Sequence, residues 1–148
     1  MLKLPPPIWT LIYLAIAGAV SWALGWPGLP GLPQPLIGGA LFFLAWVFPV
    51  WAVRLFQMEG TELDPASTTN ARLIVRGPYR VTRNPMYLGL TVSTIGLAIW
   101  IGDWPFLVVP VAVFLTANFV HIPFEEANMR RQFGDAYDRY TARVRRWL

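Results

Sequence analysis

The chain has 148 residues, of which 55% are hydrophobic and only 14% are charged, so its composition excludes an ordinary soluble domain, where about 25% of residues are charged. The absence of cysteine excludes disulfides, thiolate metal sites and a cysteine nucleophile. The length indicates one domain, and basic loops that orient a membrane protein explain the net charge of +4 more simply than nucleic-acid binding does.

Four apolar stretches follow one another along the chain. They run from Ile8 to Leu24, from Pro35 to Val53, from Met86 to Gly102 and from Trp104 to Phe124. Each is close to the ~20 residues that a helix needs to cross a ~30 Å hydrocarbon core, and none contains lysine or arginine. The sequence therefore predicts an all-α, polytopic integral membrane protein with four transmembrane helices.

The first stretch has an alternative interpretation as a signal peptide, because the small-residue pattern Ser21-Trp22-Ala23 lies at its end. Lys3 is the only basic residue ahead of it, and its apolar run is longer than the ~7–15 residues usual in signal peptides. We therefore expect a transmembrane helix here.

Small residues and prolines predict how the helices pack and bend. Small residues let helix backbones approach closely in lipid, and two rows stand out: Ala15, Ala19 and Ala23 in the first stretch, and Gly89, Ser93 and Gly96 in the third. Three prolines fall inside helical segments, where each removes a backbone hydrogen bond and is expected to kink or interrupt the helix: Pro49, Pro110 and Pro123.

The tail, from Glu125 to about Arg146, is predicted to form an amphipathic helix. Its aromatic and apolar residues step by three and four, which places them on one helix face: Phe133, Tyr137, Tyr140, Val144 and Trp147. Gly134 is expected to interrupt this helix.

All twelve basic residues fall on one side of the membrane if the chain crosses four times. They are Lys3, Arg54, Arg72, Arg76, Arg80, Arg83, Arg130, Arg131, Arg139, Arg143, Arg145 and Arg146. The positive-inside rule makes that side the cytoplasm. We therefore expect the central loop and both termini to be cytoplasmic, in the inner membrane.

Polar groups that suit chemistry gather in two places. The first is the segment from Arg76 to Tyr87, in which Asn84-Pro85 marks the start of a helix. Free N–H groups and the positive dipole end at such a start favour an anion. The second place combines Asn118, His121 and Glu125, at helical spacings of three and four, with Glu126 beside them. The alternative is that the arginines only orient the chain and that the glutamates are solvated at the interface.

Read in order, these segments resemble the isoprenylcysteine carboxyl methyltransferase family and its phospholipid methyltransferase relatives. The matching residues are Gly77-Pro78-Tyr79-Arg80, Arg83 to Gly89, Glu125-Glu126, Phe133 to Tyr137, Tyr140 and Arg143 to Trp147, with Gly60-Thr61 and Asp64-Pro65 ahead of them as in bacterial members. Eukaryotic prenylcysteine enzymes have histidine in place of Asn84 and contain more helices, so the resemblance does not specify a prenylcysteine substrate.

The resemblance implies an enzyme that uses S-adenosylmethionine as methyl donor and a membrane lipid or lipophilic small molecule as acceptor. Methyl transfer from a sulfonium requires no metal, and with one histidine and no cysteine a protein-built metal site is not expected. Arg83 and Glu125 are the implied catalytic residues. The implied donor contacts are Val75, Gly77, Tyr79, Arg83, Asn84, Pro85, Tyr87, His121, Glu125 and Glu126.

Two further readings remain open from the sequence. One is a reductase-like relative of the same fold, although such relatives are longer and use a nicotinamide cofactor. The other is a small non-catalytic membrane protein that retains the site. Binding of the donor or of its product would separate both from a methyltransferase.

Overall fold

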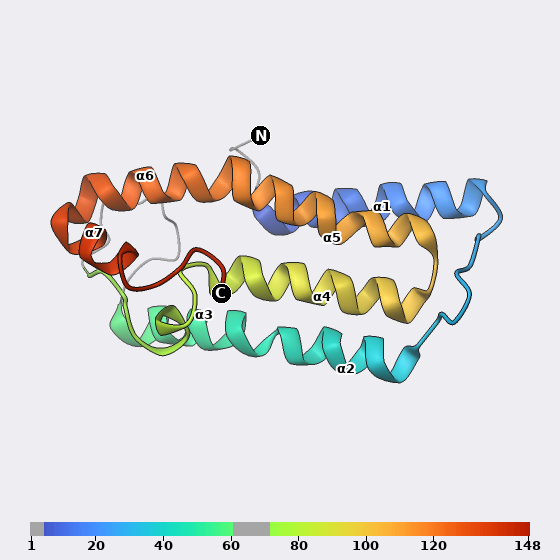
Figure 1. Cartoon of the computed structure of the whole chain (residues 1–148), viewed down its shortest axis with the longest axis horizontal. Coiled ribbons are helices and arrows are strands. Elements are labelled where there is room, and N and C mark those ends of the chain that lie inside the picture. Colours follow the sequence, from blue (N-terminus) through green and yellow to red (C-terminus); the bar gives the residue numbers. More distant parts are fainter. Residues whose placement is uncertain (1–4, 61–71) are drawn as a thin grey trace.

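The computed structural model describes residues 5–60 and 72–148, which are mostly helical (Figure 1). The elements are α1 (Pro6–Ala23), α2 (Pro35–Ala45), α3 (Val47–Glu59), the 3-10 helix η1 (Gly77–Arg80), α4 (Pro85–Ile101), α5 (Trp104–Thr116), the π-helix η2 (Ala117–His121), α6 (Ile122–Phe133) and α7 (Asp135–Thr141). No strand occurs within these residues, which confirms the all-α prediction for the part described. Lys3, Thr61, Asp64 and Pro65, which the sequence interpretation used, lie outside it.

Within residues 5–60 and 72–148, three helical stretches are long and apolar enough to cross a membrane: Pro6–Ala23, Pro35–Glu59 and Trp104–Phe133. α4 is also apolar but has only 17 residues. The chain is therefore a multi-pass membrane protein in which three to four apolar helices can cross the bilayer.

The second apolar helix extends beyond the predicted end at Val53, to Glu59, and it is interrupted. α2 ends at Ala45, and Trp46 separates it from α3. Pro49 lies one turn later and has no N–H to donate to the carbonyl of Ala45. The interruption predicted at this proline is confirmed.

The prediction of a separate tail helix from Glu125 to Arg146 is wrong. The helix that starts at Trp104 passes Phe124 and continues through η2 and α6 to Phe133, because a π-helical turn accommodates Pro123 without ending the helix. Gly134, with φ +48° and ψ −128°, then turns the chain into α7. The break predicted at Gly134 is confirmed, and α7 ends early, at Thr141.

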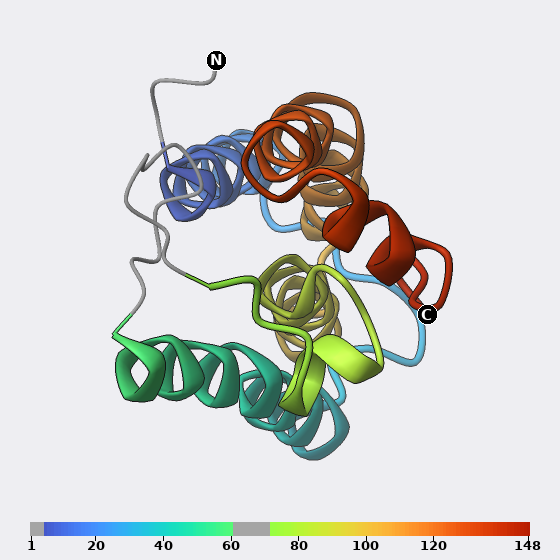
Figure 2. The ribbon, with the colours of Figure 1, turned by 90° about the vertical axis from the view of Figure 1, so that its left-hand side faces the viewer.

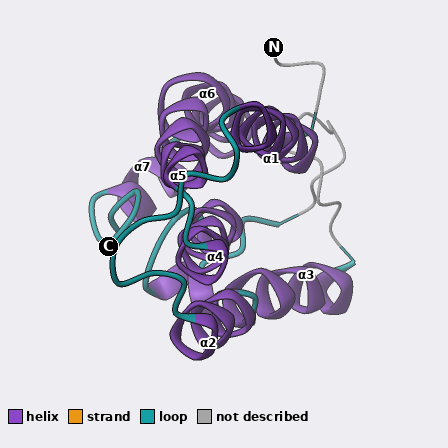
Figure 3. Cartoon of the chain, turned by 90° about the vertical axis from the view of Figure 1, so that its right-hand side faces the viewer, coloured by secondary structure: helices purple, strands orange, loops and turns teal. Residues whose placement is uncertain are grey.

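Glycines bring α4 close to the helix formed by α2 and α3. A Cβ at Gly96 would lie 2.5 Å from the backbone nitrogen of Phe42, and one at Gly89 would lie 2.3 Å from the ring of Pro49. Both glycines and Ser93 are buried, so the packing role predicted for this row is confirmed. Figure 3 shows α4 between α2 and α5.

α1 packs against α5 through a different face from the one predicted. Ala17 and Ser21 are buried, whereas the row Ala15, Ala19 and Ala23 is exposed, so the predicted face is wrong. A 2.7 Å hydrogen bond between the hydroxyls of Tyr13 and Thr116 holds α1 in this rotation. The spacing of small residues alone could not predict which face of α1 is buried, because apolar residues occupy most of the circumference of this helix.

Candidate functional site

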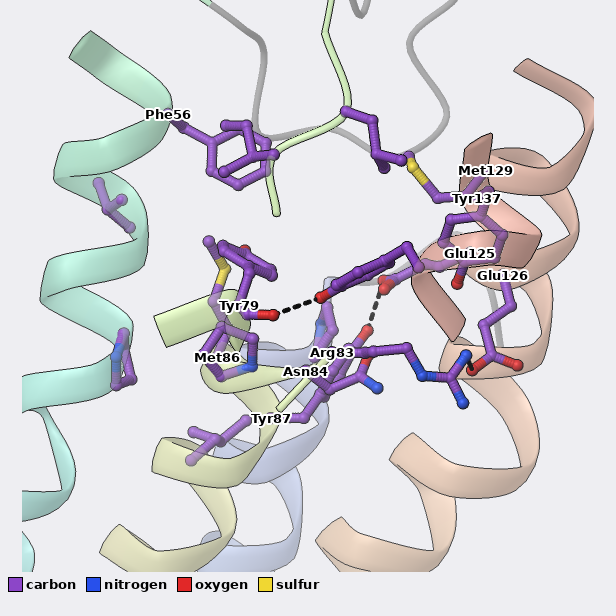
Figure 4. Close-up of a pocket in the computed structure, with 18 of the residues that line it drawn as sticks. Phe56, Tyr79, Arg83, Asn84, Met86, Tyr87, Glu125, Glu126, Met129 and Tyr137 are labelled. Carbon is purple, nitrogen blue, oxygen red and sulfur yellow. Dashed lines mark hydrogen bonds and ion pairs between the residues drawn. The ribbon is translucent and has the colours of Figure 1, made fainter. Parts of the chain in front are cut away.

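A cavity of about 420 Å³ lies at one end of the bundle, near the start of α4. Figure 2 shows the ribbon from this end, where α3, α6 and α7 lie around the start of α4. The volume of the cavity is within the ~300–1,000 Å³ typical of small-molecule sites. Its apolar side includes Trp46, Pro49, Val53, Phe56, Met86 and Leu90, and its charged groups are Arg72, Arg83, Glu125 and Glu126. Figure 4 shows Phe56 on α3 facing the acidic pair on α6 across the cavity, with the start of α4 between them.

A tight turn leads the chain toward α4. Gly77 has φ +61°, and a Cβ there would lie 3.2 Å from the side chains of Trp51 and Leu55, so a larger residue would be both strained and crowded. η1 follows and places Tyr79 in the cavity wall. The turn thus delivers one aromatic side chain to the site, while Arg76 and Arg80 remain exposed.

The first turn of α4 forms part of the cavity wall. Pro85 is its first residue, where a missing N–H removes no helix bond. Asn84 precedes it but makes no side-chain cap, and its amide nitrogen donates to the carbonyl of Arg146 at 2.9 Å. The first N–H groups of α4 have no acceptor within the helix, so the positive end of the helix dipole lies at the cavity.

The two glutamates on α6 have different partners. Glu125 accepts a 2.6 Å hydrogen bond from the phenol of Tyr87. Glu126 forms an ion pair with Arg83 at 2.9 Å and receives two hydrogen bonds from Arg146, at 2.6 and 3.1 Å. Both oxygens of Glu126 are therefore held by guanidinium groups, which gives a compact cluster of two cations and one anion.

Tyrosines from the loop and from α7 complete the wall. The hydroxyl of Tyr140 donates to the carbonyl of Tyr79 at 2.8 Å, and the ring of Tyr79 packs edge-on against Phe56. Burial raises the pKa of both Tyr79 and Tyr140 above the usual value, and it also raises the pKa of Tyr137, with a further contribution from Glu126. These phenols therefore stay neutral at physiological pH.

His121 and Asn118 do not lie together with Glu125 as the helical spacing predicted. His121 is buried behind Tyr87, with stacked rings 6.2 Å apart, and faces α1 rather than the main cavity. Asn118 instead accepts a hydrogen bond from the indole of Trp147 at 3.0 Å and a longer one from Arg146 at 3.4 Å. The π-helical turn between these residues changes the side-chain register.

The structure brings most of the predicted donor contacts to one cavity, whose wall includes Tyr79, Arg83, Asn84, Pro85, Tyr87, Glu125 and Glu126. Val75 is 44% exposed, and neither it nor Gly77 nor His121 forms the wall of that cavity. Sequence reasoning missed Trp46 and Phe56 in the wall and the contact of Arg146 with Glu126. The helical spacing of the aromatic residues in the tail could have predicted the part of the wall near α7. Three of them line the cavity: Phe133, Tyr137 and Tyr140.

Comparison with known proteins adds two findings. A family model described as phospholipid methyltransferase matches residues 33–136, which is more than half of the chain and includes most of the cavity wall. An uncharacterized protein of Haemophilus influenzae (strain ATCC 51907 / DSM 11121 / KW20 / Rd) is 35% identical over 63 residues, which are 43% of this chain and 100% of that protein.

Proposed function

This chain belongs to the phospholipid methyltransferase family, and we propose that it transfers a methyl group from S-adenosylmethionine to a lipophilic or amphiphilic acceptor at the cytoplasmic membrane face. Membership of the family makes it a membrane methyltransferase. The donor, the acceptor class and the membrane face are the proposed parts. The carrying observation is one cavity that combines an apolar side with a carboxylate and a guanidinium.

The charged groups of the cavity match the charges of the donor. S-adenosylmethionine, when bound, supplies an electrophilic methyl group on a sulfonium, and its methionine part carries an ammonium and a carboxylate. Arg83 and the start of α4 offer positive charge for the carboxylate. Glu125, positioned by Tyr87, offers a counter-charge for the ammonium or sulfonium.

We assign the ammonium to Glu125, because this carboxylate lines the cavity and the phenol of Tyr87 positions one of its oxygens. Tyr79, Asn84 and Pro85 complete the proposed donor contacts. Val75, Gly77 and His121 then act from outside the wall, Gly77 by shaping the turn and His121 by backing the ring of Tyr87.

The acceptor is proposed to lie against the apolar side of the cavity. Trp46, Pro49 and Val53 belong to a helix that is long and apolar enough to cross the bilayer, and Pro6 and Pro7 of α1 also line the cavity. An acyl or other apolar chain contacting these residues remains out of water. Alignment of the acceptor with the bound donor and exclusion of water supply several kcal/mol of rate enhancement in such reactions.

We further propose that residues 1–148 form a single methyltransferase domain in the inner membrane, with four crossings and cytoplasmic termini. The segregation of the twelve basic residues supports this topology. A reductase-like relative and a non-catalytic membrane protein are the alternatives, and neither requires a site for the methyl donor.

A calorimetric titration of the purified protein with S-adenosylhomocysteine, the demethylated donor, tests the proposal. We expect saturable binding that Arg83→Ala weakens strongly. Arg54→Ala is the matched control, because Arg54 is an exposed arginine on α3 that does not line the cavity. No binding by the parent protein would refute S-adenosylmethionine as the methyl donor. Equal, small effects of the two substitutions would place the donor elsewhere. Binding would justify a screen of radiolabelled methyl transfer to lipid acceptors.

A further inference from the structure

The last residues of the chain reach back to the start of α4 (Figure 1). The backbone N–H of Arg83 donates to the carbonyl of Arg145 at 3.0 Å. The hydroxyl of Thr82 and the amide of Asn84 both donate to the carbonyl of Arg146, at 3.1 and 2.9 Å. Two consecutive carbonyls near the C-terminus therefore hold the three residues that lead into α4.

The side chains of Arg146 and Trp147 contact the helix formed by α5, η2 and α6. The guanidinium of Arg146 donates to both oxygens of Glu126 on α6. The indole of Trp147 donates to Asn118, and its ring packs on Phe114 with centroids 4.8 Å apart. Arg146 thus connects the start of α4 with α6, using its backbone for one and its side chain for the other.

Arg146 also shares Glu126 with Arg83, the proposed partner of the donor carboxylate. The side chains of Arg83 and Glu126 are only 14% and 12% exposed, and Arg83 contacts Glu126 at 2.9 Å. Since Arg146 fixes Glu126 from one direction, the carboxylate presents a defined position to Arg83. The two guanidinium groups and one carboxylate leave an excess positive charge near the positive end of α4.

We propose that Arg146 is a positioning residue of the donor site, which holds Glu126 and the turn from Thr82 to Asn84 and thereby orients Arg83 toward the carboxylate of the donor. This inference rests on the proposed function. Arg146 does not itself form the cavity wall, so its effect on the donor is indirect and should depend on the group that Arg83 contacts.

The test compares two ligands by calorimetry: S-adenosylhomocysteine and its analogue that lacks the methionine carboxylate. Arg146→Gln should lower the affinity for S-adenosylhomocysteine about tenfold or more, which is the scale of one charged hydrogen bond. It should change the affinity for the analogue by less than about twofold. Arg145→Gln is the matched control, because it removes the same charge from the neighbouring exposed side chain and keeps the backbone carbonyl. It should change neither affinity by more than about twofold.

A uniform loss of affinity for both ligands would overturn the inference, because Arg146 would then act only through the stability of the fold. Unchanged affinity for S-adenosylhomocysteine would overturn it as well. If Arg146→Gln does not yield folded protein, Arg146→Lys replaces it, and a smaller loss confined to the carboxylate-bearing ligand is expected. Parent protein that binds neither ligand refutes the proposed function, and this inference with it. If the parent protein binds both ligands with equal affinity, the donor site stands, but the ligand carboxylate does not contribute to binding and the proposed role of Arg146 is refuted.

Discussion

Replacing Glu125 by glutamine removes a charge from the cavity while preserving its shape. The amide is almost the same size as the carboxylate, and its oxygen can still accept the 2.6 Å hydrogen bond from Tyr87. If Glu125 binds the ammonium of the donor, the variant loses one charged hydrogen bond, worth about 1.5–3 kcal/mol. Its affinity for S-adenosylhomocysteine should then fall roughly 10- to 150-fold, with little change in the free energy of unfolding.

Glu126→Gln is the matched comparison one residue along the helix. Its side chain is 12% exposed and holds Arg83 and Arg146 together. Removing one partner of a buried ion pair costs about 3–5 kcal/mol. The side chain of Arg146 is 33% exposed, so we expect the lower end, about 3 kcal/mol, which corresponds to a fall in melting temperature of roughly 10 °C.

The assay measures S-adenosylhomocysteine binding by calorimetry and melting by tryptophan fluorescence, for the parent and both variants in the same detergent. Glu125→Gln should lose affinity at an unchanged melting temperature, whereas Glu126→Gln should melt earlier. Tyr87→Phe keeps the charge of Glu125 but removes its hydrogen bond, so its loss of affinity should be smaller than that of Glu125→Gln. If Glu125→Gln binds as tightly as the parent, Glu125 is a solvated interfacial residue and the proposed donor site is wrong.

Three other predictions concern topology, packing and pH. Reporter fusions at Pro30 and at the C-terminus should report opposite sides of the membrane, and the same side for both would contradict four crossings. Gly96→Ala should destabilise the protein by about 1–3 kcal/mol, because the added Cβ would lie 2.5 Å from the backbone of Phe42; an unchanged melting temperature would contradict this close helix contact. Burial raises the folded-state pKa of Tyr79 and Tyr140 above the unfolded value of 10, so their contribution to stability is complete below pH 10 and is lost as pH rises through the folded pKa. Tyr140→Phe should lessen the loss of stability above pH 10, and an identical pH profile would show that Tyr140 does not contribute.

The starts of the apolar helices and the end of α4 could be predicted to within two residues, because a proline or glycine lies at or next to each of these positions. α4 runs from Pro85 to Ile101, one residue from the prediction at each end, and α5 begins at Trp104 as expected. Gly102, with φ +74°, ends α4 in a left-handed conformation that glycine adopts readily. Local backbone chemistry determines these boundaries, and the sequence displays it directly.

Contacts between distant segments could not be predicted in the same way. Arg83 forms an ion pair with Glu126, and Arg146 hydrogen-bonds to the same carboxylate. Arg146 lies 20 residues after Glu126 in the chain. Helical spacing describes neighbours on one element, and it gives no information about which loop or terminus packs against that element.

The register of the fourth helix explains why Glu125 and Glu126 could not be distinguished from the sequence. Steps of three and four place Asn118, His121 and Glu125 on one face only if the helix keeps 3.6 residues per turn. In η2 the N–H of Ile122 instead donates to the carbonyl of Ala117, five residues earlier, so the turn contains an extra residue. Side chains beyond it are rotated by about 100°, the angle of one residue.

After that rotation Asn118 and Glu126 both contact Arg146, while Glu125 meets Tyr87. The π-turn lies directly ahead of Pro123, whose missing N–H already prevents a regular helical bond at that point. The proline therefore helps to determine which of two adjacent carboxylates is engaged by arginines and which accepts the phenol at the cavity wall. The partners of the two carboxylates thus follow from a backbone irregularity that ends four residues before Glu125, and the acidic pair alone does not encode them.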